Sequence, residues 1–185
     1  MNIYDFDGTI YHGDSTFDFY FYALKKHPGL VRFLPKQAAA FALYALKRID
    51  KTAMKERFYI FLTGINAEGM LEAFWDTHEK NIYPYYKAQQ KEDDIIISAS
   101  PEFLLKPICA RLGIRHLMAS RVDPKTGAYT GLNCWGSEKV RRLEAQMGIT
   151  HCDEFYSDSH SDAPLAGIAH KAFLGDKEGN LRQWD

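Results

Sequence analysis

The sequence has few of the features that mark secreted, membrane-spanning and nucleic-acid-binding proteins. Its three cysteines, Cys109, Cys134 and Cys152, form no CxxC pair, so we expect free thiols and a cytoplasmic location. Its 23 basic and 24 acidic residues give a net charge of −1, which offers no electrostatic basis for binding nucleic acid. The first residues also lack the basic and apolar regions of a signal peptide.

Long apolar runs are missing as well. No stretch reaches the roughly 20 apolar residues that span a bilayer, and the nearest covers residues 38–46. This run predicts either a buried helix or a surface that contacts lipid, because cations flank it and basic side chains can face lipid headgroups. The flanking cations are Arg32, Lys36, Lys47 and Arg48.

A pair of carboxylates does stand out close to the start of the chain. Asp5 and Asp7 follow a short apolar run and precede Gly8. If residues 1–5 form a strand, alternation directs both carboxylates to the same side, and Gly8 lets the chain leave the strand in a conformation that other residues resist. Carboxylates at a strand end suit Mg²⁺, which prefers oxygen ligands, although a plain turn uses the same residue types.

The 185 residues are enough for one domain with an insert. Residues 13–90 read as helical, whereas strands and helices alternate from residue 91 onward. This alternation predicts a parallel, doubly wound α/β sheet. We therefore expect a Rossmann-like core of residues 1–12 and 91–185, with a helical cap of residues 13–90 inserted after the first strand. Helices are expected at 14–26 (capped by Asp14 or Ser15), 30–46 (interrupted by Pro35), 52–62, 67–83, 100–113, 137–147 and 164–170. Strands are expected at 1–5, 94–98, 116–120, 154–157 and 171–174, and a hairpin at 121–134.

Ser98 lies where the strand at 94–98 is expected to end. Its hydroxyl and the backbone amides of Ala99 and Ser100 would face an anion, because a helix start presents free N–H groups. A plain helix cap, with Ser100 capping and Pro101 in the first turn, explains the same residues.

Three further charged residues lie near strand ends or helix starts. Lys139 lies in the first turn of a helix capped by Ser137, where a cation opposes the helix dipole. Taken alone, Lys139 is typical of a solvated surface lysine. Asp158 and Asp162 follow the expected strand at 154–157, and acids in loops are common.

These positions, in this order, resemble the four motifs of the haloacid dehalogenase superfamily of phosphatases. The motifs are Asp5-Phe6-Asp7-Gly8-Thr9, Ser98, Lys139, and Asp158 with Asp162. The plan is similar to the branch of phosphoserine-phosphatase-like enzymes, in which the helical cap follows the first motif. Residues 133–140 and 156–165 are also similar to phosphatidylglycerophosphatase C.

The resemblance implies a role for each matching residue. Asp5 would be the nucleophile and become an aspartyl phosphate, and Asp7 would be the general acid and base. Lys139 would offset negative charge on Asp5 and on the transferring group. The phosphate would be held by Ser98, Ala99 and Lys139, and Mg²⁺ by Asp5, Asp7 (through its carbonyl) and Asp158, with Asp162 as a supporting acid.

The substrate is less well defined than the chemistry. The resemblance predicts an Mg²⁺-dependent hydrolase of a phosphomonoester, and a soluble small molecule is the first expectation. A lipid phosphate such as phosphatidylglycerophosphate is the alternative, with peripheral membrane contact through the cap. A phosphotransferase and a catalytically inactive phosphate-binding module are further readings. The oligomeric state does not follow from the sequence.

Overall fold

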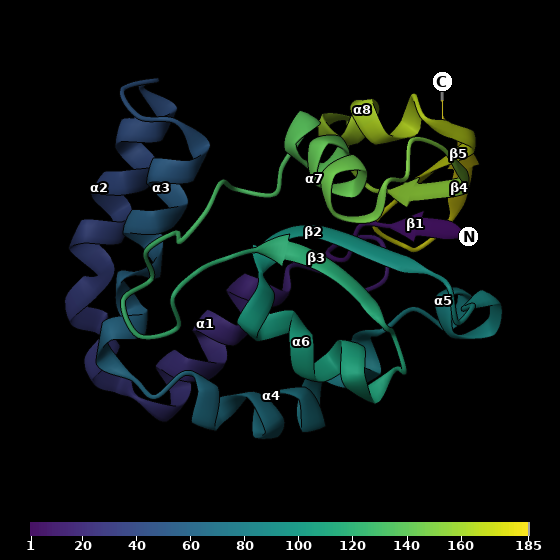
Figure 1. Ribbon diagram of the computed structural model, residues 1–185. Helices are drawn as coiled ribbons and strands as arrows, with labels where there is room; N and C mark the ends of the chain where they lie inside the picture. Colours follow the sequence, from purple (N-terminus) through teal and green to yellow (C-terminus); the bar gives the residue numbers. More distant parts are fainter. Residues whose placement is uncertain (185) are drawn as a thin grey trace.

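The computed structural model describes residues 1–184 and contains one six-stranded sheet with the order β3-β2-β1-β4-β5-β6 (Figure 1). Strands β1 to β5 are parallel, and β6 is antiparallel to β5. The strands are β1 (Asn2–Tyr4), β2 (Ile95–Pro101), β3 (His116–Ser120), β4 (Cys152–Ser157), β5 (Ala169–Gly175) and β6 (Leu181–Gln183). This sheet confirms the predicted Rossmann-like α/β class.

The first strand lies in the centre of the sheet. In β1, Ile3 is opposite Ile95 of β2 on one side and Phe155 of β4 on the other. All three residues are fully buried, as expected for strands covered on both faces. Because β1 is central, the residues that follow it emerge in the middle of the carboxyl edge of the sheet.

Within residues 1–184, eight α-helices connect and cover the strands (Figure 1). They are α1 (Ser15–Lys26), α2 (Leu34–Ala45), α3 (Lys51–Phe58), α4 (Leu71–His78), α5 (Pro84–Gln89), α6 (Glu102–Arg111), α7 (Ser137–Met147) and α8 (Ala163–Ala166). Short 3₁₀ helices lie at Pro28–Phe33, Tyr59–Gly64, Glu68–Met70, Glu79–Asn81 and His160–Asp162. Helices α7 and α8 pack on one face of the sheet and α6 on the other.

The helical segment between β1 and β2 has two parts with different neighbours. Helices α1, α2 and α3 lie to one side of the sheet, whereas α4 lies under it beside α6 and α5 lies near the start of β2 (Figure 1). The Trp75 indole of α4 donates a hydrogen bond to the carbonyl of Leu104 in α6 at 2.8 Å, and Tyr86 of α5 packs edge-on against Tyr4. Only α1 to α3 therefore extend beyond the layers of the core.

Several predicted boundaries differ from the structure. The helix expected at 30–46 begins as a 3₁₀ turn and becomes α2 only at Leu34. Pro35 lies in the first turn of α2 rather than interrupting it, because a first-turn residue needs no N–H partner. The helices expected at 52–62 and 67–83 are likewise shorter, since each gives way to 3₁₀ turns.

The segments around β2 and α7 also need correction. Strand β2 continues to Pro101, so Ser100 does not cap α6, and Pro101 takes the N-cap position. Ser137 is the first residue of α7, after Gly136 at φ +59°. The expected hairpin at 121–134 is reduced to a single bridge between Val122 and Tyr129, and the sequence reasoning did not foresee β6.

Candidate active site

The turn after β1 places two carboxylates in one cavity. The Phe6 carbonyl accepts hydrogen bonds from the amides of Thr9, Ile10 and Tyr11, so the chain closes tightly. Gly8 adopts φ +70° within this turn, a conformation that side-chain-bearing residues resist. As a result, Asp5 and Asp7 both line a cavity of about 210 Å³.

Asp7 is held by two donors. The Ser15 amide at the start of α1 donates to Asp7 Oδ1 at 2.7 Å, and the Ser100 hydroxyl donates to Oδ2. Burial, together with the nearby Asp14 charge, raises the pKa of Asp7 to about 7. A carboxyl with this pKa can carry a proton near neutral pH, as a general acid requires.

Lys139 is buried between two carboxylates. Its Nζ lies 3.1 Å from Asp5 Oδ1 and 2.7 Å from Asp162 Oδ2, and its side chain is 1% exposed. Burial alone would lower the pKa of Lys139, but the two carboxylates outweigh it and raise the pKa to about 12. The reading of Lys139 as a solvated surface lysine is therefore wrong.

The two partners of Lys139 have different surroundings. Burial raises the pKa of Asp5 to about 6, and the Lys139 charge offsets part of this effect. Asp162 also accepts a hydrogen bond from the Ser157 hydroxyl at 2.8 Å, while its Oδ1 is buried with no hydrogen-bond partner among residues 1–184. Asp162 thus fixes the position of Lys139, and Asp5 presents its carboxylate to the cavity.

The end of β2 forms the opposite wall. Ser98, Ala99 and Ser100 all line the cavity, but the Ser100 amide donates to Ser98 Oγ at 3.1 Å. Because α6 begins only at Glu102, these residues do not form the helix start that the sequence predicted. Ser100 instead contacts Asp7, a role that its position before a proline gave no reason to expect.

The donor set fits a hard cation. Asp158 lies so close to Gly8 that a Cβ on Gly8 would stand 2.1 Å from Asp158 Oδ2, so the glycine makes room for this carboxylate beside Asp5 and Asp7. Among residues 1–184, no group of three or more His, Cys, Asp or Glu side chains is already arranged as a metal site. Mg²⁺ needs only one or two carboxylates beside carbonyl, water and phosphate oxygens. The cavity wall contains five carboxylates, Asp5, Asp7, Asp14, Asp158 and Asp162, against three lysines, Lys51, Lys55 and Lys139.

Two of these lysines come from α3 and were missed by the sequence reasoning. Lys55 Nζ donates to the Ala99 carbonyl at 3.1 Å, and burial lowers its pKa although the Asp14 charge opposes this. Lys51 Nζ lies 5.1 Å from the ring centroid of Trp135, which also lines the cavity. The sequence carries no local signal for this contact, because it depends on how α3 packs against the core.

The chain was also compared with models of known protein families. The model of the haloacid dehalogenase-like hydrolases matches residues 3–167. The chain belongs to this family. The family predicted from the ordered motifs is thereby confirmed.

Curated relatives and solved structures are consistent with this membership. The chain is 36% identical over 106 residues to a protein of Mycobacterium tuberculosis (strain H37Rv) named a probable phosphatase, a match that covers 50% of this chain and 37% of that relative. The chain thus spans well under half of that relative. It is 26% identical to the histidinol-phosphatase of Neisseria meningitidis serogroup C, over 99% of this chain and 93% of the relative.

The fold also occurs in a crystal structure of a protein of unknown function from Bordetella pertussis Tohama I. The TM-score is 0.74 and the identity 21%, with 95% of this chain and 89% of that chain covered. None of these three matches bears on the similarity to phosphatidylglycerophosphatase C, which stays a prediction.

Proposed function

We propose that this protein is an Mg²⁺-dependent phosphomonoester hydrolase that works through an aspartyl-phosphate intermediate. The observation that carries the proposal is the buried Asp5–Lys139–Asp162 row beside Asp7. A carboxylate nucleophile and a phosphate dianion repel each other, so such a site must supply positive charge. Lys139 supplies it within reach of Asp5.

In the first step, an Asp5 carboxylate oxygen attacks phosphorus and the bond from phosphorus to the leaving oxygen breaks. Asp7 gives its proton to the leaving oxygen, so that the product is a neutral alcohol. The Ser100 hydroxyl and the Ser15 amide hold the Asp7 carboxyl in place during this transfer. Lys139 offsets the charge on the transferring group.

In the second step, water attacks the aspartyl phosphate. Asp7, now ionised, accepts a proton from this water, the bond between phosphorus and the Asp5 oxygen breaks, and inorganic phosphate leaves. Asp5, the Asp7 carbonyl and Asp158 would hold Mg²⁺, which would neutralise phosphate charge when bound. Asp162 keeps Lys139 directed at Asp5 in both steps.

A soluble small-molecule phosphate is the first candidate substrate. A lipid phosphate is the second, and one observation favours it. A pocket of about 190 Å³ adjoins the catalytic cavity and shares Asp14, Lys51 and Lys55 with it. Its remaining wall is mostly apolar, formed by Thr16, Phe17, Phe41, Met54, Phe58 and Tyr59. An apolar cavity of about 150 Å³ accepts a ring the size of benzene, so this pocket can take an apolar part of the alcohol.

The test is phosphate release by the purified protein with Mg²⁺ across a panel of phosphomonoesters. The panel contains an aryl phosphate, phosphoserine, histidinol phosphate, hexyl phosphate, and phosphatidylglycerophosphate in detergent. Asp5→Asn should reduce turnover of every substrate by about 10³-fold or more, because the amide is no nucleophile. Asp93→Asn, at an exposed carboxyl outside the cavity, should leave turnover unchanged.

The outcomes separate the candidate functions. Appreciable residual turnover by Asp5→Asn would remove Asp5 as the nucleophile. If a second alcohol lowers the release of inorganic phosphate while the leaving alcohol is still released and a new phosphate ester forms, the protein would be identified as a phosphotransferase. A wild-type protein that is inactive on the whole panel yet still binds phosphate would identify a binding module instead.

A further inference from the structure

The segment from residue 19 to residue 49 has an unusual charge distribution. It contains no aspartate or glutamate, although the whole chain has 24 acidic residues. It contains six cations, Lys25, Lys26, Arg32, Lys36, Lys47 and Arg48. A near-neutral protein therefore has one strongly basic segment, which forms the outer part of the α1–α3 cap (Figure 1).

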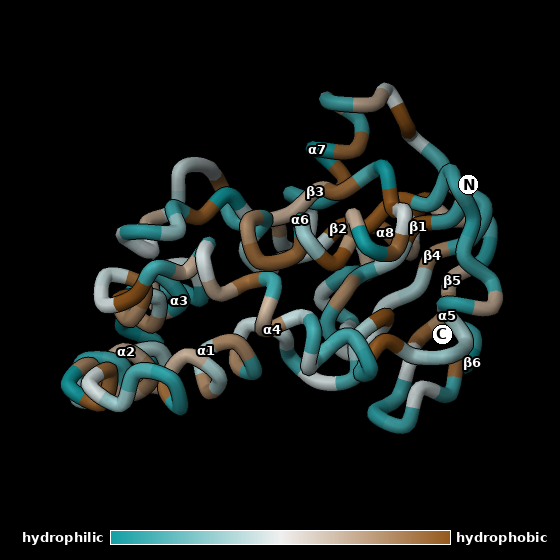
Figure 2. Tube along the Cα trace, turned by 90° about the horizontal axis from the view of Figure 1, so that it is seen from below, coloured by the Kyte–Doolittle hydropathy of each residue, from teal (hydrophilic) through white to brown (hydrophobic). Residues whose placement is uncertain are grey.

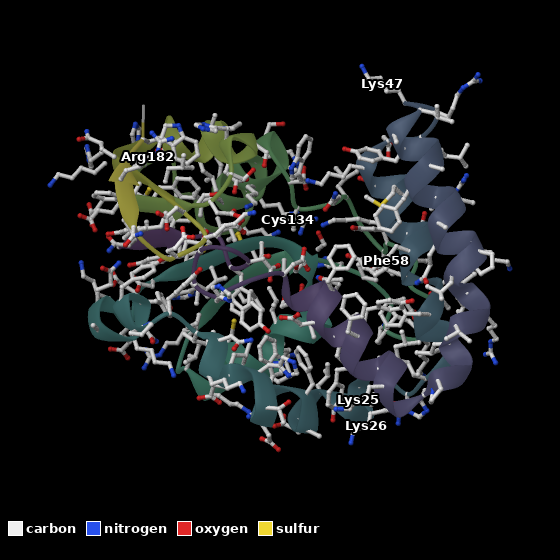
Figure 3. The ribbon with its side chains drawn as sticks, turned by 180° about the vertical axis from the view of Figure 1, so that it is seen from behind. Lys25, Lys26, Lys47, Phe58, Cys134 and Arg182 are labelled. Carbon is white, nitrogen blue, oxygen red and sulfur yellow. The ribbon has the colours of Figure 1, made fainter. Side chains whose placement is uncertain are left out.

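The charges of these six cations are not neutralised by acidic side chains in the described part of the chain. Among residues 1–184, none of the six forms an ion pair with a carboxylate. Two of them lie over aromatic rings of their own segment, Lys26 over Tyr22 and Arg32 over Phe33. Figure 3 shows Lys47 at the free tip of the α2–α3 hairpin and Lys25 and Lys26 at the far end of α1.

The same segment exposes large apolar side chains. Of nine such side chains among residues 1–184, six belong to it, namely Phe21, Val31, Leu34, Phe41, Tyr44 and Leu46. Phe21 is 60% and Leu46 is 70% exposed. Hydrophobic and hydrophilic stretches alternate along α1 and α2 (Figure 2). We call the six cations and these six apolar side chains the basic apolar face.

Helix α2 shows why this exposure needs an explanation. Nearly every residue of α2 is apolar, yet only Gln37 and Ala40 are buried. Gln37 is held by the Tyr20 hydroxyl and the Phe58 carbonyl, so this polar residue faces inward. Most of the apolar residues of α2 are exposed instead. The expectation of a buried helix at 38–46 is thus wrong. A helix that is apolar on most sides normally has a partner on most sides.

We propose that the basic apolar face docks the enzyme onto an anionic lipid surface. Aliphatic and aromatic side chains between cations match the boundary between acyl chains and negative headgroups. A nucleic acid would match the cations but not Leu34, Phe41 and Leu46. No helix within residues 1–184 is long and apolar enough to cross a membrane, so the contact proposed is peripheral.

The face is joined to the catalytic cavity. Phe41, one of its members, and Phe17 line the apolar pocket that shares Lys51 and Lys55 with the cavity. Phe58 lines the same pocket and packs against both rings. A phosphomonoester with an apolar tail could therefore pass from the bilayer to Asp5 along protein surface. This last step rests on the proposed function, whereas the docking does not.

The test is co-sedimentation of the full chain with vesicles of phosphatidylcholine alone and of phosphatidylcholine mixed with phosphatidylglycerol. We expect binding to the mixed vesicles, weakening as salt is added. The variant Lys36→Glu with Arg48→Glu should bind them about tenfold or more weakly, because each cation near the headgroups contributes to the attraction. Lys171→Glu with Lys177→Glu makes the same charge change outside the face and should bind as the wild type does.

A second pair of variants tests the contribution of the exposed apolar side chains. Leu46→Gln should weaken vesicle binding severalfold, whereas Leu132→Gln, at a residue 64% exposed outside the segment, should not. Equal binding by both charge variants, or no wild-type binding to mixed vesicles, would overturn the proposal. So would a stable dimer that Leu46→Gln dissociates, or binding to RNA that lipid does not compete for. Failure here with intact phosphate release would leave the proposed function standing.

Discussion

At the scale of single residues, Lys139 shows how far the sequence leads. An isolated lysine in the first turn of a helix predicts a surface position, yet this side chain is almost completely buried against Asp5 and Asp162. Only the order of the four motifs pointed to the site. The Ser100–Asp7 hydrogen bond had no such signal, because it depends on β2 running three residues beyond Ser98.

Gly8 allows a sharp test at this scale. In Gly8→Ala, the new methyl group would overlap the Asp158 carboxylate, at 2.1 Å from Oδ2, and would strain a backbone at φ +70°. We expect a loss of about 1–2 kcal/mol in the free energy of unfolding from the backbone, together with a large loss of phosphatase activity because Asp158 is displaced. Urea unfolding and phosphate release measure the two effects.

Gly113→Ala is the matched control for this variant. Gly113 has φ +71°, but a Cβ at this position would have no neighbouring atom within 4 Å, so the substitution imposes the same backbone strain far from the site. It should lose similar stability and keep full activity. If Gly8→Ala were as active as Gly113→Ala, the close approach of Asp158 to Gly8 would have no importance for catalysis.

At the scale of elements, the sequence predicted whether a segment is a helix or a strand better than it predicted where that helix or strand ends. Of the two residues that the sequence offered as caps for α1, Asp14 rather than Ser15 is the cap, with Oδ1 accepting from the amides of Thr16 and Phe17. The continuous apolar run Ile95–Ile97 located β2, because a strand buried on both faces has such a run. Strand β3 lies at the edge of the sheet and is only partly buried. The predicted helix boundaries at Pro35 and Pro101 were wrong, because a proline indicates that a helix boundary is near but not its exact position.

Helix α7 carries a prediction that depends on pH. Glu138 bonds to Arg141 and Arg142, and Arg142 reaches the Ala119 carbonyl at the end of β3. The two arginines lower the pKa of Glu138 to about 2, below the usual value near 4.5. The ionised form is favoured in the folded state, so this stabilisation is complete above about pH 5 and is lost as the pH falls toward 2.

Glu138→Gln should therefore lower the free energy of unfolding by about 1–2 kcal/mol at pH 7. The difference in the free energy of unfolding between this variant and the wild type should be smaller at pH 3. Urea unfolding at pH 7 and at pH 3 measures this difference. Glu144→Gln, at an exposed residue of the same helix, should have little effect at either pH. If the difference in the free energy of unfolding between Glu138→Gln and the wild type stayed constant with pH, Glu138 would act by packing rather than by charge.

At the scale of the whole molecule, strand–helix alternation was sufficient to predict a parallel sheet, and the structure confirms it. The alternation could not predict that α4 and α5 pack under the sheet while α1 to α3 extend from it. That division depends on contacts such as Trp75 with Leu104, which join residues far apart in the chain. The catalytic cavity also depends on long-range packing, since α3 contributes Lys51 and Lys55 to it.

The proposed metal dependence would be a property of this assembled cavity. A chelator should abolish phosphate release, and Mg²⁺ should restore it. Mg²⁺ should also raise the midpoint of thermal unfolding, because binding at about 100 times the dissociation constant adds about 2.7 kcal/mol of stability. In Asp158→Asn this shift should be much smaller. Turnover that survives the chelator, or an equal thermal shift in Asp158→Asn, would contradict the assigned ligands.

The central position of β1 has a consequence for synthesis on the ribosome. Its neighbour β4 is encoded near the other end of the chain, where Asn2 meets Glu154. At about 5–20 residues per second, the first strand waits roughly 8 to 30 seconds before that partner leaves the ribosome. During this interval β1 lacks its partner on the β4 side, so we expect the helices that follow or a chaperone to shield this edge of the nascent chain.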